Sequence, residues 1–194
     1  MFFHYPNDAK ANALQYQYFY GPGLLVAPVT EENSTSTTIY LPDDVFYDYY
    51  THATVRGTGA EITLDDVAFT SIPLYYKGGS IVALRANSAN TTTELRKENF
   101  KLIIAPALDG TAKGDLYLDD GESVEQKATS VIHFAYAKGV FTTSGSFGYD
   151  AGVSIESVVV LGGNASSTAA TAGGAKSRLL SAAIPLTGPT TVNL

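Results

Sequence analysis

Three pairs of adjacent aspartates are the side chains of this 194-residue sequence best suited to acid–base catalysis. Glycosidic bond hydrolysis needs two carboxylates that face each other about 5 to 9 Å apart. Neighbouring residues of a strand point to opposite faces, and all three pairs lie in turn-like sequence, where Asp commonly binds its own backbone. We therefore predict turn residues rather than catalytic residues at Asp43-Asp44, Asp65-Asp66 and Asp119-Asp120.

The remaining reactive side chains also lack the spacing of a known site. His4, His52 and His133 are far apart in the sequence and show no metal-ligand spacing. The absence of cysteine excludes a disulfide, a thiolate zinc site and a cysteine nucleophile. Residues 119–122 resemble part of a calcium loop, but the loop length and the closing Glu are missing. The sequence predicts no catalytic residue, no cofactor and no metal site in this chain.

Aromatic residues are abundant, with 13 Tyr and 9 Phe. Aromatic rings stack on sugars, so Tyr47, Tyr49 and Tyr50 could form a carbohydrate-binding patch. The alternative is that the aromatics fill the core and pack against a neighbouring domain. The sequence favours packing and leaves the patch as the second interpretation.

Three Asn-x-Ser/Thr sequons begin at Asn33, Asn90 and Asn164. Each lies in a segment predicted to be a loop, where an acceptor for an N-linked glycan must be exposed. Together with the Thr-rich β composition, they predict a secreted, extracellular glycoprotein.

Composition excludes several classes of protein. Hydrophobic residues make up 45% and charged residues 16%, which is incompatible with intrinsic disorder. The net charge is -7 without a Lys/Arg cluster, so no nucleic-acid partner is expected. No apolar run approaches the roughly 20 residues that cross a bilayer, so no membrane partner is expected either.

Apolar runs bounded by turn residues predict a mainly β protein. The one predicted helix covers residues 9–19, with Asp8 as its N-cap, and stops at Gly21-Pro22-Gly23. Residues 72–84 predict a hairpin that turns at Gly78-Gly79. Residues 162–177 are of low complexity and predict a loop. Strands are predicted at 2–5, 24–29, 37–41, 45–50, 61–64, 72–76, 80–84, 100–105, 115–118, 131–136, 140–143, 154–161, 179–186 and 190–194.

Four stretches carry a family resemblance: MFFHYPND at 1–8; QYFYGPGLLVAPV at 17–29; YLP at 40–42 with FYD at 46–48 and IPLYYKGGSIV at 72–82; and LYLDDGES at 116–123. In this order they resemble the C-terminal portion of glycoside hydrolase family 31, especially its α-glucosidases.

The resemblance implies two antiparallel β-sandwich domains, preceded by the final strand and helix of a (β/α)8 barrel. Residues 1–22 would be the last β/α unit of that catalytic barrel, residues 23–90 a proximal sandwich and residues 91–194 a distal sandwich. The family's two catalytic aspartates would lie upstream, because no position here matches either motif. His4 stands where relatives commonly carry an acidic residue, so no role is transferred to it.

Three functions follow as hypotheses. The favoured one is the C-terminal chain or fragment of a secreted retaining α-glucosidase that acts on malto-oligosaccharides. It would complete and buttress the barrel, bind the preceding catalytic part non-covalently and leave most substrate contacts to that part. The alternatives are a stand-alone carbohydrate-binding β-sandwich and a structural β protein without a ligand. The predicted aromatic N-terminal strand disfavours the structural β protein, because such a protein would expose an apolar strand edge that promotes aggregation.

Overall fold

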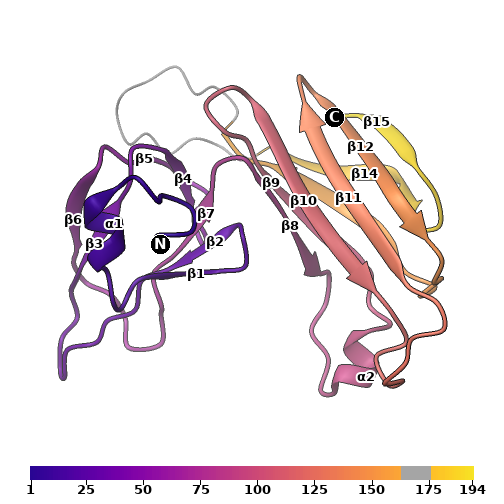
Figure 1. Cartoon of the computed structure of the whole chain (residues 1–194), viewed down its shortest axis with the longest axis horizontal. Coiled ribbons are helices and arrows are strands. Elements are labelled where there is room, and N and C mark those ends of the chain that lie inside the picture. Colours follow the sequence, from indigo (N-terminus) through magenta and orange to yellow (C-terminus); the bar gives the residue numbers. More distant parts are fainter. Residues whose placement is uncertain (163–175) are drawn as a thin grey trace. The chain divides into compact units, whose positions relative to one another are not determined.

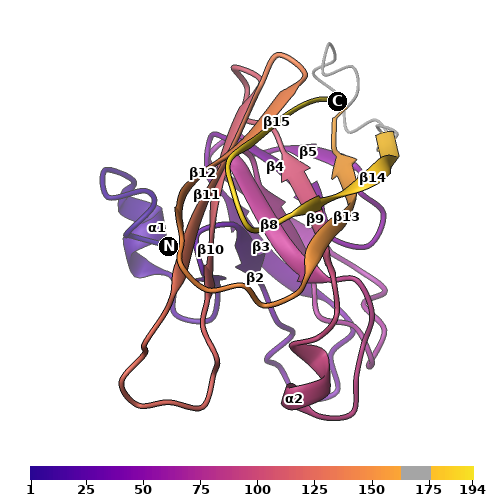
Figure 2. The same cartoon turned by 90° about the vertical axis from the view of Figure 1, so that its right-hand side faces the viewer.

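The computed structural model describes residues 1–162 and 176–194, with side chains described for residues 1–162 and 183–194. Among these residues the chain forms two compact units, residues 1–78 with Gly162 and residues 79–161 with 176–194. Both units consist mainly of β-strands, as the sequence predicts (Figures 1 and 2). No helix in the described ranges is long and apolar enough to span a membrane.

The first unit contains a five-stranded sheet in the order β1-β2-β7-β4-β5 and a separate pair, β3-β6, all antiparallel. Side chains from both sheets share one apolar core, which gives the unit its sandwich-like build. Its elements are α1 (Ala9–Ala13), β1 (Tyr18–Tyr20), β2 (Leu24–Val26), β3 (Thr37–Leu41), β4 (Val45–Asp48), β5 (Thr54–Arg56), β6 (Ala60–Leu64) and β7 (Leu74–Lys77).

The second unit is one eight-stranded sheet in the order β14-β13-β9-β8-β10-β11-β12-β15. Its pairings are antiparallel except that β13 runs parallel to β9, and β10 meets β8 in parallel at Lys113 and Ser80. Its elements are β8 (Ser80–Arg85), α2 (Thr92–Leu95), β9 (Phe100–Ala105), β10 (Thr111–Leu118), β11 (Ser130–Ala137), β12 (Val140–Phe147), β13 (Ser154–Val160), β14 (Lys176–Pro185) and β15 (Thr190–Asn193).

This long sheet closes over a single core. Leu102 of β9, Ile155 of β13 and Phe141 of β12 are all fully buried in one cluster, although β12 lies four places from β9 in the sheet order. Along β11 buried and exposed residues alternate, with Ile132 and Phe134 facing inward. Strands that lie so far apart in the sheet order can contribute to one buried cluster only if the sheet curves over on itself.

The beginning of the chain differs from the prediction. Residues 2–4 form a turn instead of a strand, and the N–H groups of His4 and Tyr5 donate to the Met1 carbonyl oxygen at 3.0 and 3.2 Å. A strand needs a neighbouring strand for its backbone groups, and no strand of the described ranges pairs with these residues.

The predicted helix is shorter than expected. Asp8 is its N-cap, as predicted, and the Asp8 carboxylate accepts from the N–H groups of Lys10 and Ala11. The helix ends at Ala13 because residues 18–20 instead pair with residues 24–26 as strands β1 and β2. Gly21 adopts φ +62° in the turn between these strands.

The predicted Gly-Gly hairpin is wrong in its pairing. Strand β7 pairs with β2 and β4, whereas β8 pairs with β9 and β10, so the strands on either side of Gly78-Gly79 join different sheets. The compact units accordingly divide at Gly78-Gly79, before the expected domain limit at residue 90.

Candidate functional site

Five exposed aromatic side chains lie within the first twenty residues and form the candidate functional region of the first unit. Phe3 is 86% exposed and Tyr20 74% exposed, and β1, which carries Tyr18 and Tyr20 on one face, is an edge strand. Burying such a ring is worth roughly 1.5–3 kcal/mol, so their exposure marks a surface suited to a partner. We call the following residues the N-terminal aromatics: Phe2, Phe3, Tyr16, Tyr18 and Tyr20.

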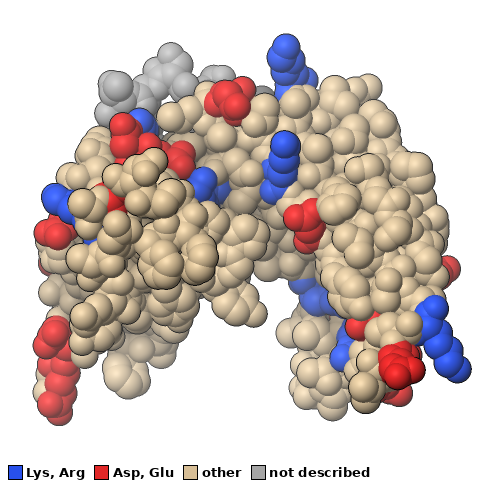
Figure 3. Space-filling model, viewed as in Figure 1, with Lys and Arg blue, Asp and Glu red and all other residues tan. Residues whose placement is uncertain are grey.

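The surrounding surface carries little charge. In the view of Figure 3, Lys, Arg, Asp and Glu lie mainly toward the rim of the first unit, and uncharged side chains cover the area over the N-terminal turn, β1 and β2. Protein interfaces are depleted of charge at their centre and enriched in aromatic residues. This region therefore has the composition of a protein–protein contact.

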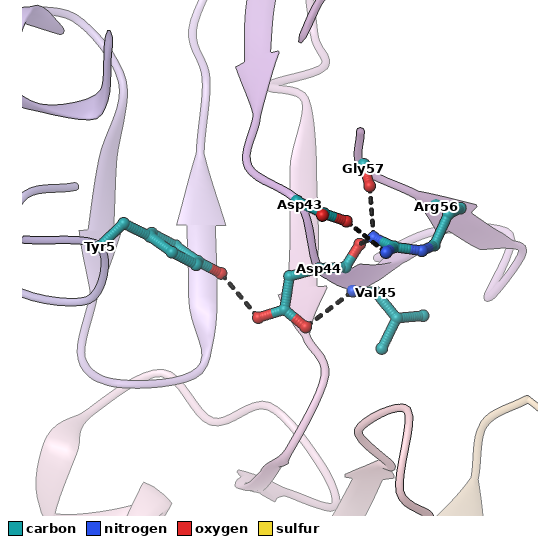
Figure 4. Close-up of polar contacts among 6 residues, drawn as sticks. All are labelled: Tyr5, Asp43, Asp44, Val45, Arg56 and Gly57. Carbon is teal, nitrogen blue, oxygen red and sulfur yellow. Dashed lines mark hydrogen bonds and ion pairs between the residues drawn. The ribbon is translucent and has the colours of Figure 1, made fainter. Parts of the chain in front are cut away.

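Tyr5 fastens the N-terminal turn to the sheets of the first unit. Its hydroxyl donates to Asp44 Oδ2 at 2.9 Å, and the Val45 N–H donates to Asp44 Oδ1 at 2.8 Å (Figure 4). Lys77 Nζ lies 3.1 Å from Asp44 Oδ2 and 5.7 Å from the centre of the Tyr5 ring. Burial, followed by the Asp44 charge and hydrogen bond, raises the pKa of Tyr5 well above its usual range. This contact holds segments 39 residues apart in the sequence.

Arg56 organises the loop that presents Asp44. Its guanidinium bonds the Asp43 carboxylate and the Gly57 carbonyl oxygen, and also donates to the Asp44 carbonyl oxygen at 2.8 Å (Figure 4). Gly57 permits this packing, because a Cβ there would lie 2.0 Å from the Pro42 carbonyl oxygen. The pair Asp43-Asp44 is thus a turn, as predicted, with each carboxylate engaged in holding the fold.

A second contact fastens the helix. The Tyr40 hydroxyl donates to Asp8 Oδ2 at 2.6 Å, and Lys10 Nζ lies 5.7 Å from the centre of the Tyr40 ring. The hydrogen bond to Asp8, followed by burial, raises the pKa of Tyr40 to about 12. The same bond is the largest cause that lowers the pKa of Asp8.

Gln17 makes a third contact, which the sequence gives no sign of. Its amide oxygen accepts from the Tyr40 N–H at 2.9 Å, and its amide nitrogen donates to the Tyr40 carbonyl oxygen at 2.5 Å. The side chain is buried and replaces a neighbouring strand beside β3. It therefore fixes the segment that leads into β1, and with it the positions of the N-terminal aromatics.

Comparisons with known proteins show what this chain is similar to. The glycosyl hydrolase family 31 C-terminal domain matches residues 1–82. A probable alpha/beta-glucosidase agdC of Neosartorya fischeri is 47% identical over 199 residues, which covers 100% of this chain and 23% of that protein. A probable alpha/beta-glucosidase of Arthroderma benhamiae is 52% identical over 164 residues, or 84% of this chain and 19% of that protein.

The chain belongs to glycoside hydrolase family 31. It spans about a quarter of the length of the curated relatives that it matches. The crystal structure of an ER glucosidase II heterodimeric complex shares its fold, with a TM-score of 0.81 at 24% identity over 100% of this chain and 25% of that chain. A family 31 alpha-xylosidase from Xanthomonas citri gives a TM-score of 0.68 at 22% identity, covering 100% of this chain and 21% of that chain.

The structure of this family 31 chain does not bring its three histidines together. His4 packs 4.4 Å from the Phe19 ring, and His52 lies 6.4 Å from the Tyr76 ring. His133, in the second unit, forms an exposed pair with Asp115. Within residues 1–162 and 183–194, no three His, Asp or Glu side chains are grouped so that they could hold a metal ion.

The two other acidic pairs lie in connections between strands. Asp66 has φ +56°, between β6 and β7. Asp120 accepts from the N–H groups of Glu122 and Ser123 at 2.9 Å, and from the Ser123 hydroxyl at 2.6 Å. These bonds, led by that of the hydroxyl, lower the pKa of Asp120 well below its usual range. The calcium-like sequence at 119–122 is therefore a loop in which the Asp120 carboxylate binds the residues that follow it in the chain.

The structure keeps two of the three tyrosines of the predicted sugar patch together, since the Tyr49 and Tyr50 rings pack edge to face at 5.2 Å, but it does not expose all three. Tyr47 is buried in the sheet, at 2% exposure, and cannot stack on a ligand. Tyr49 already stacks on Tyr76 at 5.1 Å. Tyr50 is exposed, and its hydroxyl donates to the Ile72 carbonyl oxygen at 3.0 Å. The patch as predicted is therefore wrong for Tyr47, because that side chain is buried on the face of β4 opposite Phe46.

Two of the three predicted glycan acceptors are exposed. Asn33 lies in a turn with φ +59°. Asn90 comes just before Thr91, which caps α2 by accepting from the Glu94 N–H. Asn164 lies outside the described residues. The exposure of Asn33 and Asn90 leaves room for a glycan at each.

Proposed function

We propose that this chain is the C-terminal part of a secreted, retaining α-glucosidase that releases terminal α-linked glucose from malto-oligosaccharides. Its task in that enzyme is to complete the catalytic barrel with residues 1–22 and to buttress it with the β-rich units that follow. The observation that carries the proposal is the exposure of the N-terminal aromatics on a fixed segment, in a chain that spans about a quarter of its relatives.

The preceding part of the enzyme is the proposed partner. Without cysteine in this chain, a disulfide cannot join the two parts as separate polypeptides, so their attachment rests on non-covalent packing. A stable interface of this kind buries more than about 1,000 Å² and has aromatic anchors at its centre. The N-terminal aromatics supply such anchors, and the Tyr5, Asp8 and Gln17 contacts keep them in place.

The proposed chemistry belongs to that partner. In a retaining glycosidase one carboxylate attacks the anomeric carbon and a carboxylic acid protonates the leaving oxygen, about 5 Å away across the bond. None of the acidic pairs of this chain faces such a partner, because each lies in a connection between strands. The α-glucoside is accordingly held mainly by the preceding part, and the chain acts by supporting the barrel that holds the carboxylates.

Secretion and glycosylation complete the proposal. They rest on the three sequons, of which Asn33 and Asn90 are exposed. The occupancy of the sequons is measured from the mass of the protein purified from its source, before and after removal of N-linked glycans. An unchanged mass would contradict the glycoprotein assignment.

Reconstitution tests the proposed role. The preceding part and this chain are produced separately and mixed, and the release of glucose from maltose is measured. We expect activity only in the mixture, and we expect the double variant Tyr18→Ser/Tyr20→Ser to lower it at equal concentration. Tyr50→Ser, which removes an equally exposed tyrosine from another part of the first unit, is the matched control. Two folded parts that give no activity when mixed would overturn the proposal.

A further inference from the structure

One pocket of the second unit gathers aromatic, cationic and acidic side chains. It lies where α2 and the connection from β10 to β11 approach the residues after β12, at one end of the unit (Figures 1 and 2). The Arg96 guanidinium links two of its walls by donating to the Asp120 carbonyl oxygen at 3.2 Å. Its principal lining side chains are Arg96, Lys97, Tyr117, Asp119, Glu122 and Tyr149.

Charges of both signs face this pocket without neutralising one another. Arg96 and Lys97 are exposed cations, and Asp119 and Glu122 supply the carboxylates. Within the part of the chain that the structure describes, none of these four side chains takes part in an ion pair. The pocket therefore offers hydrogen-bond donors and acceptors together, and its near balance of charge favours neither an anionic nor a cationic ligand.

Two neighbouring charges are already engaged by the fold. Arg85 lies over the Phe100 ring at 4.0 Å and donates to the Glu98 carbonyl oxygen at 2.7 Å. The Asp120 carboxylate accepts three bonds from its own turn. These contacts hold the walls of the pocket, and they leave Arg96, Lys97, Asp119 and Glu122 to meet a ligand.

Tyr117 gives the pocket an aromatic face. It is 54% exposed, and it lines the pocket together with Asp119, two residues further along the chain. The apolar face of a pyranose ring packs on such an aromatic ring, while its hydroxyl groups both donate to carboxylates and accept from guanidinium or ammonium groups. An uncharged carbohydrate satisfies all of these groups at once, whereas a phosphate or a metal ion would meet like charges.

We propose that this pocket binds a chain of neutral, α-linked glucose units, with Tyr117 as the stacking platform and Arg96 and Asp119 as the polar contacts. The choice of glucose units rests on the proposed function, and the neutral carbohydrate class rests on the pocket itself. The site would hold a polysaccharide substrate on the second unit while its end is hydrolysed elsewhere.

Affinity electrophoresis of the whole 194-residue chain in native gels with soluble starch tests the proposal. We expect starch to retard the chain. Tyr117→Ala should weaken the apparent affinity about tenfold, as the loss of a central aromatic contact commonly does. Tyr117→Phe keeps the ring and should retain most of the binding, while Arg96→Ala should weaken it. Tyr50→Ala, an exposed tyrosine of the first unit, is the matched control and should bind like the parent chain.

Each contrary outcome is decisive. If the chain is folded and starch does not retard it, the proposal is overturned. The proposal is also overturned if Tyr50→Ala abolishes starch binding while Tyr117→Ala leaves it intact. Retardation of the isolated chain that is absent from the intact longer enzyme also overturns it, because the pocket would then be covered there. Activity of the reconstituted enzyme on maltose is measured separately, so that failure of the pocket and failure of the proposed α-glucosidase role give different results.

Discussion

Asp44 is the residue on which most contacts of the N-terminal turn converge. It accepts from the Tyr5 hydroxyl, and its side chain and that of Lys77 are each only 21% exposed. We expect Asp44→Asn to lower the free energy of unfolding by about 1.5–3 kcal/mol, because a partly buried charged hydrogen bond and an ion pair are weakened together. Urea unfolding measures this change.

Asp43→Asn is the matched control for that prediction. The Asp43 side chain is 73% exposed, and an exposed ion pair such as that with Arg56 contributes about 0–1 kcal/mol. Equal losses in the two variants would show that the Tyr5, Asp44 and Lys77 contact has no special role in stability.

Tyr40 predicts a dependence of stability on alkaline pH. Its pKa is raised from 10.0 to about 12 in the folded chain, so the unfolded chain loses the proton first. The stabilisation is complete below pH 10 and is lost as the pH rises through about 12. In unfolding experiments across this range, Tyr40→Phe should flatten the decline. Tyr16→Phe, on an exposed ring, should leave it unchanged, and identical slopes in all three proteins would contradict the assignment.

At the scale of the elements, the Gln17 side chain makes the two backbone hydrogen bonds to Tyr40 of β3 that a neighbouring strand would otherwise make. Gln17→Ala leaves the N–H and the carbonyl group of Tyr40 without these partners, and we expect a loss of about 1–3 kcal/mol in the free energy of unfolding. Gln15→Ala removes an exposed side chain of the same type and should change little. A loss no larger for Gln17→Ala than for Gln15→Ala would count against this role.

Gly114 sets how closely β10 approaches β8. A Cβ at this position would lie 2.2 Å from the Ile81 carbonyl oxygen, where the two strands meet in parallel. We expect Gly114→Ala to cost at least about 1–3 kcal/mol, because backbone must move to admit the methyl group. At Gly188 an added Cβ has no neighbour within 4 Å, so Gly188→Ala is the control. Thermal unfolding of both variants compares them.

The sequence predicts the elements whose apolar pattern is local. Residues 37–41, 100–105 and 131–136 alternate or run apolar between turns, and all three lie within strands β3, β9 and β11 of the structure. The prediction fails where pairing decides the outcome. The strand predicted at residues 2–5 is not formed, because no strand of residues 1–162 and 176–194 pairs with it. The Gly78-Gly79 turn separates two sheets, because β7 and β8 pair with other strands.

The contacts of the candidate region are less predictable than the strands. The Asp8 cap follows from its position before a helical run, and it is confirmed. Tyr5 and Asp44 are 39 residues apart, and Gln17 and Tyr40 are 23 apart, so no local spacing connects them. Tyr47 resembles its neighbours Tyr49 and Tyr50 in sequence, and its burial follows from its place in β4, where Val45, Phe46 and Tyr47 are all buried because both faces of the strand are covered.

At the scale of the whole molecule, the exposed N-terminal aromatics should make the isolated chain prone to association. Nine large apolar side chains of the first unit, among them Phe3 at 86% and Phe69 at 105% exposure, face solvent. We expect the chain alone to self-associate at high concentration and the preceding part of the enzyme to suppress this. Light scattering with and without that part measures the effect, and Tyr18→Ser/Tyr20→Ser should reduce it.

The central claim is that this chain works as one part of a larger family 31 hydrolase. The mass of the protein purified from its source, measured under native and then under denaturing conditions, tests the claim most directly. We expect this sequence to be found with the preceding catalytic part, either as one longer polypeptide or as two that separate only on denaturation. A chain of 194 residues that is folded, monomeric and alone under native conditions would contradict it.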